Sequence, residues 1–168
     1  RRLDWATFWR VLVETGHVTA SVLILVLGAT MYSRMLALSG LPAFFGSWMA
    51  GAGFSFHLLI SIFVVTVILM GTVLDSISIM LVLLPLILPV LIGMNVNLIW
   101  FGVVTVIAVE IGLLTPPFGL AVYVIKSTLN DNRISLLDIF AGAFPFAIIM
   151  LLVLVLIIAV PPLSLLLL

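Results

Sequence analysis

Long apolar runs, separated by short polar or small-residue interruptions, dominate the chain. The stretch from Val11 to Ser33 is almost uncharged and is long enough for the roughly 20 residues that a membrane-spanning helix needs. Further apolar runs follow at 54–70, 76–94, 98–125 and 140–160. This pattern predicts an all-α integral membrane protein that folds as a multi-span helical bundle.

Charged and turn-forming residues indicate where the helices begin and end. The first residues mix charges with Trp5 and Trp9, which predicts an amphipathic start at the membrane surface. We expect the first span to end at Arg34 and a short helix to follow at 44–51, after a Gly-Leu-Pro turn. The polar stretch 126–138 is predicted to be a loop or surface helix outside the hydrocarbon.

Basic residues give a prediction of topology. Residues Lys126 and Arg133 would share the cytoplasmic side with the basic chain start if the intervening segments cross the membrane an even number of times. Arg34 is the exception, and the C-terminal end would then lie outside. This count fits two full spans at 54–95 and one re-entrant hairpin equally well.

Composition narrows the class of protein. Hydrophobic residues make up 65% of the 168, charged residues 7%, and the mean hydropathy is +1.54. A soluble domain is about 45–50% apolar and about 25% charged, so the lipid bilayer must be the solvent for most of this chain. The six basic and six acidic residues are scattered, which argues against a nucleic-acid partner.

Several kinds of chemistry are not expected. Cysteine is absent, and His17 and His57 are far apart without neighbouring ligands, so we expect no transition-metal site and no cofactor. No catalytic Ser/His/Asp order or HExxH motif occurs, so the protein is not expected to be an enzyme and no residue is assigned as catalytic. No targeting peptide is recognised, and the sequence fits a fragment of a longer chain.

Two interruptions in neighbouring apolar segments stand out. One is the small and polar patch at 71–78, and the other is the break at 110–119, where Thr115 precedes two prolines. Irregular backbone at membrane depth costs several kcal/mol per unpaired group unless protein, water or an ion satisfies it. In secondary transporters such broken helices bind coupling ions and anionic substrates, so we expect a site here.

Hard oxygen ligands for a cation are available at both interruptions. At the first they would come from Gly71, Thr72, Asp75, Ser76 and Ser78. At the second, Thr115 and the carbonyl groups of Gly112 and Leu114 are candidates, and Glu110, Thr115 and Pro117 could line a substrate path.

Other interpretations of the two carboxylates remain open at this point. Asp75 could lie in an ordinary loop at the water interface. Glu110 could be a buried carboxyl that is protonated or paired with a backbone donor. The spacing does not distinguish Na⁺ from H⁺, because either residue could carry a proton if burial favoured its neutral form.

The order of these motifs resembles a known transporter family. The segments that carry the likeness are 71–80 (GTVLDSISIM), 84–89 (LPLILP), 100–103 (WFGV) and 110–120 (EIGLLTPPFGL). Together they resemble the large membrane subunit of tripartite ATP-independent periplasmic (TRAP) transporters along essentially the whole chain. The family's large subunits are more than twice as long, so the chain is similar to their C-terminal half.

The resemblance implies one inverted repeat of an elevator-type carrier in the bacterial inner membrane. Residues 1–53 would hold an amphipathic start, a scaffold span and a connector. Residues 54–127 would form a transport-domain repeat with a re-entrant hairpin at 54–95 and an interrupted helix at 98–125. Residues 128–168 would be a polar loop and a C-terminal scaffold span.

The resemblance also implies Na⁺ coupling, with Gly71, Asp75, Ser76 and Ser78 as ion-site candidates at the hairpin tip. At the helix break the candidates are Gly112, Thr115, Pro116 and Gly119. The implied substrate is an organic acid such as a C4-dicarboxylate or sialic acid. The implied partners are a periplasmic binding protein, a small membrane subunit and the N-terminal half of the large subunit.

One position departs from the family, and other classes remain open. Ala121 stands where the family often has Asn, which affects any expectation about the solute. A membrane structural or assembly subunit, in which the breaks only bend helices, is the main alternative. A channel would need a polar stripe along one helix, and none is apparent.

Overall fold

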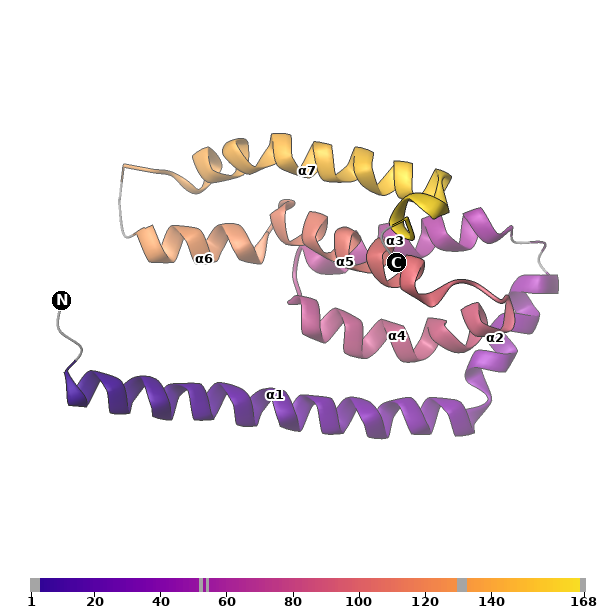
Figure 1. Ribbon diagram of the computed structural model, residues 1–168, viewed down its shortest axis with the longest axis horizontal. Helices are drawn as coiled ribbons and strands as arrows, with labels where there is room; N and C mark the ends of the chain where they lie inside the picture. The colour runs from indigo at the N-terminus through magenta and orange to yellow at the C-terminus, as the bar shows by residue number, and fades with distance from the viewer. Residues whose placement is uncertain (1–3, 52, 54, 130–132, 167–168) are drawn as a thin grey trace.

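The computed structural model describes residues 4–51, 53, 55–129 and 133–166, and these are helical with no strand among them. The elements are α1 (Trp5–Ser39), α2 (Leu41–Gly51), α3 (Phe56–Gly71), α4 (Ser76–Gly93), α5 (Leu98–Leu114), α6 (Leu120–Leu129), α7 (Leu136–Ala159) and a short 3₁₀ helix, η1 (Pro161–Ser164). This confirms the predicted all-α membrane bundle (Figure 1).

Helix α1 is a single helix of 35 residues, which corrects two expectations. The charged start is continuous with the span from Trp5 onward, and Arg34 does not end the helix, since a long basic side chain can extend toward the interface. The helix ends at Gly40, which adopts the left-handed conformation with φ of 71°. From Glu14 to Arg34 the rise is about 30 Å, which matches the hydrocarbon thickness.

Helix α2 begins directly after this turn, at Leu41 rather than at the expected residue 44. Helices α1, α4 and α7 are each long and apolar enough to cross a membrane. Helices α5 and α6 are shorter, but α7 packs along both of them, so the pair together follows the length of one spanning helix (Figure 1). The predicted interrupted helix is therefore present.

Helices α3 and α4 form one hairpin alongside α5. The start of α3 lies beside the start of α5, because the rings of Phe56 and Trp100 have centroids 5.8 Å apart. The α4–α5 connection at 94–97 lines the same small groove as these two rings. The hairpin turns at 72–75 next to the end of α5, while α6 and the start of α7 continue beyond the turn (Figure 1).

The position of the hairpin tip bears on the two topologies left open by the sequence. By length alone α4 could span a membrane, and both topologies place the two ends of the hairpin at one end of the molecule. The tip lies beside the break between α5 and α6, and α6 and α7 continue beyond it, which favours a re-entrant segment (Figure 1). The expected first residue of this segment, Phe54, lies outside the described residues. With a re-entrant hairpin, two crossings, α1 and the α5–α6 pair, separate Arg10 from Lys126.

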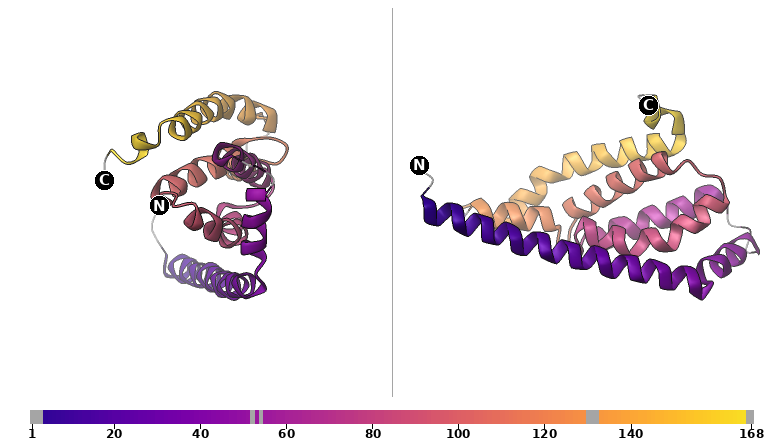
Figure 2. Two further views of the ribbon diagram at one scale, coloured as in Figure 1. Left: turned by 90° about the vertical axis from the view of Figure 1, so that its right-hand side faces the viewer. Right: turned by 60° about the horizontal axis from the view of Figure 1, so that its bottom comes forward.

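The basic residues follow that topology. The start of α1 and the α6–α7 connection lie at the same end of the molecule in two orientations (Figures 1 and 2). This end holds Arg10, Lys126 and Arg133, whereas Arg34 is near the other end of α1. Arg1 and Arg2 lie outside the described residues. The positive-inside rule predicts that this end is cytoplasmic.

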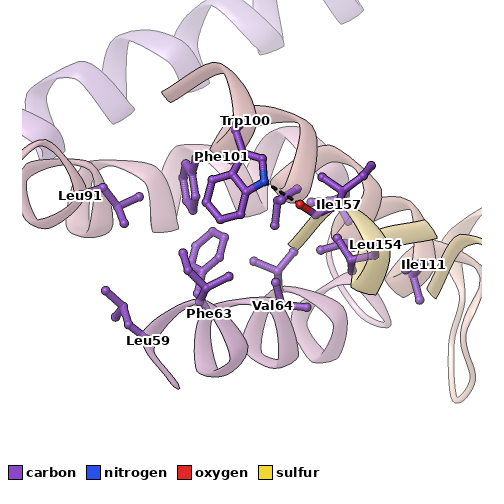
Figure 3. Close-up of a cluster of buried hydrophobic side chains, with 14 of the residues drawn as sticks. Leu59, Phe63, Val64, Leu91, Trp100, Phe101, Ile111, Leu154 and Ile157 are labelled. Carbon is purple, nitrogen blue, oxygen red and sulfur yellow. Dashed lines mark hydrogen bonds between the residues drawn. The ribbon is translucent and has the colours of Figure 1, made fainter. Parts of the chain in front are cut away.

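The buried core is formed mainly by α3, α5 and α7 (Figure 3). The Phe63 and Phe101 rings lie 4.9 Å apart between α3 and α5. Trp100 donates its indole N–H to the Ile157 carbonyl at 2.9 Å, which joins α5 to the end of α7. Helices α1 and α2 contact the rest of the chain chiefly through α4, so they are peripheral to this core.

Candidate functional site

The hairpin tip is a short turn that is closed by local hydrogen bonds. Helix α3 ends at Gly71, and the backbone N–H of Thr72 donates to the Leu69 carbonyl. Asp75 is the N-cap of α4, where one carboxylate oxygen accepts from the Ser78 backbone N–H at 3.0 Å and the other accepts from the Ser78 hydroxyl. Asp75 is exposed and Ser78 half-buried, so the tip carries a hydrogen-bonded carboxylate at its surface.

The second interruption lies between α5 and α6. The Thr115 backbone N–H donates to the Gly112 carbonyl at 3.0 Å, and its hydroxyl donates to the Ile111 carbonyl at 2.6 Å. Pro116 and Pro117, joined by a cis peptide bond, cannot donate backbone hydrogen bonds and so cannot continue the helix. The backbone then turns through Gly119, with φ of 54°, into α6.

The two interruptions meet in space. The Gly119 N–H donates to the Thr72 carbonyl at 3.1 Å, which ties the helix break to the hairpin tip. Beside this bond Gly71 and Gly112 are in backbone contact, and a Cβ built on Gly112 would lie 2.7 Å from the Gly71 Cα. The sequence predicts two separate breaks, and the fold brings them together in one place.

Four helix ends converge at this place. The carboxyl ends of α3 and α5 bring their last carbonyl groups, several of which accept local hydrogen bonds, and the negative end of the helix dipole. The amino ends of α4 and α6 bring their first backbone N–H groups and the positive end, and at α4 the Ser78 N–H is already bonded to Asp75. The arrangement can therefore bind a cation at the carbonyl ends and an anionic group at the amide ends.

Side-chain hydroxyls add oxygen atoms to this place. The buried Thr72 donates its hydroxyl proton to the Leu69 carbonyl at 2.8 Å, just as Thr115 does to Ile111. Each hydroxyl oxygen keeps lone pairs that can face a cation. Among the described residues no three His, Cys, Asp or Glu side chains gather into a metal-binding group.

The structure brings together most of the residues that the sequence suggested, but these residues are buried to different degrees. Gly71, Thr72, Gly112 and Gly119 are buried. Ser76, Ser78 and Thr115 are half-buried, whereas Asp75, Pro116 and Pro117 are exposed.

Glu110 is exposed within the described chain, on the side of α5 away from Gly112 and the α3 contact. Ala121, in the first turn of α6, is half-buried.

An apolar groove of about 610 Å³ adjoins the helix break. It lies between the break, at Thr115 and Pro116, and the first turns of α7, at Phe140 and Phe144. Phe140 also packs on Gly119, because a Cβ built there would lie 2.7 Å from a Phe140 ring carbon. The break therefore lies within the span of α7 and not at its end.

Sequence reasoning missed the contacts that connect the two interruptions. The Gly119 to Thr72 bond and the Gly71 to Gly112 contact join residues that are more than 40 positions apart. A usable signal was the glycine at the end of each apolar helix, because small residues in membrane helices allow close backbone approach. The Phe140 contact with Gly119 had no comparable signal.

Comparison with known proteins places the chain in a family. The family model described as "Tripartite ATP-independent periplasmic transporter, DctM component" matches residues 1–163. The chain is 29% identical over 93% of its length to the C4-dicarboxylate TRAP transporter large permease protein of Rhodobacter capsulatus. It is also 29% identical over 97% to the 2,3-diketo-L-gulonate large permease of Escherichia coli, and 29% over 95% to the sialic acid large permease of Vibrio cholerae.

The chain matches only part of each relative. It spans 35% of the Rhodobacter protein, 38% of the Escherichia protein and 37% of the Vibrio protein. The chain therefore corresponds to about a third of the length of the curated relatives that it matches.

Proposed function

The chain belongs to the family of the DctM component of tripartite ATP-independent periplasmic transporters, and from that premise we propose that it is the C-terminal part of a Na⁺-coupled permease for an organic acid. The family and the apolar helices make it a multi-pass protein of the bacterial inner membrane. The relatives are named as permeases for C4-dicarboxylate, 2,3-diketo-L-gulonate and sialic acid, all of which are acids. An acidic solute is therefore the class that we propose here.

The observation that carries the proposal is the meeting of the hairpin tip with the helix break. Carbonyl groups at the ends of α3 and α5, with the hydroxyl groups of Thr72 and Thr115 beside them, are the hard oxygen ligands that we propose for Na⁺. Asp75 adds a negative charge at the tip. Gly71 and Gly112 serve mainly as the packing contact that holds the carbonyl groups together.

We assign the solute to the amide end of α6. The first turn of α6 directs backbone N–H groups toward an anion and begins after exposed prolines that a solute could reach, whereas the first turn of α4 is capped by Asp75. Ala121, in that first turn of α6, is then a position where this chain's solute preference differs from that of relatives with a polar residue. Ser76, at the start of α4, is the matching position on the hairpin.

We propose an elevator mechanism with a modified division of the chain. The sequence placed 128–168 in the scaffold, but α7 packs on α5 and α6, and Trp100 bonds to Ile157. This packing supports a moving unit that contains α3 to α7. Helices α1 and α2 would then be the scaffold span and the connector. The proposed partners are a small membrane subunit, a periplasmic binding protein and the rest of the large subunit.

The test uses the complete permease that contains this segment, reconstituted in proteoliposomes with its binding protein. Uptake of succinate, sialic acid and 2,3-diketo-L-gulonate is measured with a Na⁺ gradient, with a proton gradient and with neither. In parallel, the thermal unfolding of purified permease is compared in NaCl and KCl at equal ionic strength, because bound Na⁺ raises the melting temperature whatever the solute is.

The variant Thr115→Val removes the proposed ligand, and Thr105→Val is its matched control. Thr105 lies on the same helix and makes the same kind of bond, to the Phe101 carbonyl at 2.8 Å, but it lies two and a half turns before the break. We expect the Na⁺-specific stabilisation to disappear in Thr115→Val and to remain in Thr105→Val. Uptake driven by protons alone would refute Na⁺ coupling. An equal Na⁺-specific rise in melting temperature in the wild type and both variants would favour a break that only shapes the helix.

A further inference from the structure

Helix α5 has one exposed stripe, formed by Ile99, Gly102, Val106 and Glu110. These residues recur at intervals of three and four, so they share one face of the helix. The opposite side is covered, since α3 and α7 bury Phe101, Val104 and Ala108. The stripe is thus the side of α5 that no part of the described chain covers.

The composition of the stripe fits neither lipid nor water. A carboxylate facing hydrocarbon is costly, and ionisable residues in membrane helices almost always face protein or a water-filled cavity. Ile99 and Val106 are exposed by 54% and 47%, which makes a continuously hydrated face equally unsuitable. A protein surface that buries two apolar side chains and pairs with one carboxylate satisfies all three residues.

Glu110 lies on this stripe within the length of the α5–α6 pair and not at either end of it. The α5–α6 pair runs from Leu98 to Leu129, and Glu110 lies one turn before the end of α5. No hydrogen bond to its carboxylate is formed by the neighbouring turns, where Thr105 donates to Phe101 and Thr115 donates to Ile111. A donor for Glu110 must therefore come from outside the described residues.

The length of the relatives identifies the occupant. The chain corresponds to 35% to 38% of the relatives that it matches, so about two thirds of such a large subunit lies outside it. We infer that the stripe Ile99, Gly102, Val106 and Glu110 is the surface on which that remaining part of the large subunit packs, and that Glu110 is paired there with a hydrogen-bond donor of that part. This inference rests on the family and not on the coupling ion.

Two features of the stripe suit close helix packing. Gly102 has no atom within 4 Å of the place where a Cβ would be, so it leaves a shallow notch between Ile99 and Val106. A notch of this kind lets a second helix approach closely in a membrane. Once it is packed, the helix interface shields the Glu110 pair from lipid and from water.

A spin label at Val106 tests whether the face is packed. These 168 residues contain no cysteine, so Val106→Cys in the complete permease, with any other cysteines replaced, gives a single attachment point. Low accessibility to both oxygen, which partitions into lipid, and a water-soluble nickel chelate is expected. High accessibility to oxygen would show a lipid-facing stripe, and high accessibility to the chelate would show a water-filled path, and either result overturns the inference.

A photo-crosslinking amino acid at the same position identifies the occupant. Mass spectrometry of the cross-linked peptides is expected to find Val106 joined to a peptide of the same large subunit that lies outside these 168 residues. Adducts with the small subunit or with a second permease copy would assign the stripe to another partner and overturn the inference.

The pairing of Glu110 is tested by Glu110→Leu and Glu110→Gln in the complete permease. Loss of the carboxylate leaves the partner's donor unpaired, so Glu110→Leu is expected to lower the melting temperature by several degrees. Glu110→Gln keeps a hydrogen-bond acceptor and should lose less. Glu14→Leu, on the exposed start of α1, is the matched control. An unchanged or raised melting temperature in Glu110→Leu would overturn the pairing.

Discussion

Gly71 and Gly112 are in direct backbone contact, at the point where the hairpin tip meets the helix break. A Cβ built on Gly71 would lie 2.8 Å from the Gly112 Cα, and a Cβ built on Gly112 would lie 2.7 Å from the Ile68 carbonyl oxygen. These atoms belong to two helix backbones and cannot move aside independently. The separation of α3 and α5 at the site is therefore set by these two glycines.

This contact predicts that Gly112→Ala destabilises the permease and disrupts the site. Overpacking of this kind costs typically 1–3 kcal/mol, and here it must push α3 away from α5. We expect a lower melting temperature and a loss of Na⁺-dependent uptake. Gly142→Ala is the control, because that glycine lies inside α7 with nothing near its Cβ position. If both variants lowered the melting temperature and the uptake equally, the loss would come from replacing a helical glycine and not from the contact between Gly71 and Gly112.

The role of Asp75 as a helix cap can be separated from its charge. Asn is as good an N-cap as Asp, so Asp75→Asn should preserve α4, whereas Asp75→Ala should cost about 1 kcal/mol through the lost cap. We expect Asp75→Asn to weaken the response to Na⁺ with little change in melting temperature measured in KCl.

Asp138 provides the control for that comparison. It forms the capping box of α7 with Ser135, at the opposite end of α6 from the break. Asp138→Asn therefore changes a capping carboxylate without approaching the site. If Asp138→Asn weakened the Na⁺ response as much as Asp75→Asn, the loss of any one negative charge would explain the effect, and Asp75 would have no special role.

The hydrogen bond between Trp100 and Ile157 predicts a stabilising link between α5 and α7. Trp100→Phe keeps an aromatic ring in the core but leaves the Ile157 carbonyl without its donor, which should cost about 1–3 kcal/mol. Thermal unfolding of the permease measures this loss. Trp9→Phe, on the exposed start of α1, should unfold like the wild type. Equal melting temperatures for all three would mean that the link carries no stability.

The contact between Gly119 and Phe140 predicts a partial rescue. Gly119→Ala places a methyl group 2.7 Å from the Phe140 ring and also imposes a side chain on a left-handed residue. Phe140→Leu should relieve the first problem but not the second. In a double-mutant cycle on melting free energy, the two changes together should cost less than the sum of the single changes. Strict additivity would show that Phe140 does not limit the space at Gly119.

The sequence predicted individual elements better than their contacts. Helix boundaries set by glycine and proline were well predicted, because the backbone limits of these residues are local. The end of α1 was predicted five residues too early at Arg34, because a charge was read as the end of a helix that has no breaker before Gly40. The exposure of Glu110 was not predictable, since helical periodicity is hidden when nearly every position is apolar.

The candidate site shows the same division. The residue types at 71–78 and 110–119 indicated unusual backbone, which is a local property. The hydrogen bond from Gly119 to Thr72 depends on how α3 packs on α5, and a single sequence carries no record of that pairing. The contacts of α7 with Trp100 and Gly119 likewise join segments distant in the chain, so the sequence did not predict them.

Helix α4 lies between the peripheral helices α1 and α2 and the core helices, and it contains Pro85 and Pro89. Each proline removes one backbone hydrogen bond, so this helix resists bending less than its neighbours do. Because α1 contacts the core chiefly through α4, a movement of the core relative to α1 requires α4 to bend or to slide along one of its neighbours. The two prolines therefore make α4 a helix that can bend between α1 and the core, at positions about two to four turns away from the site at its amino end.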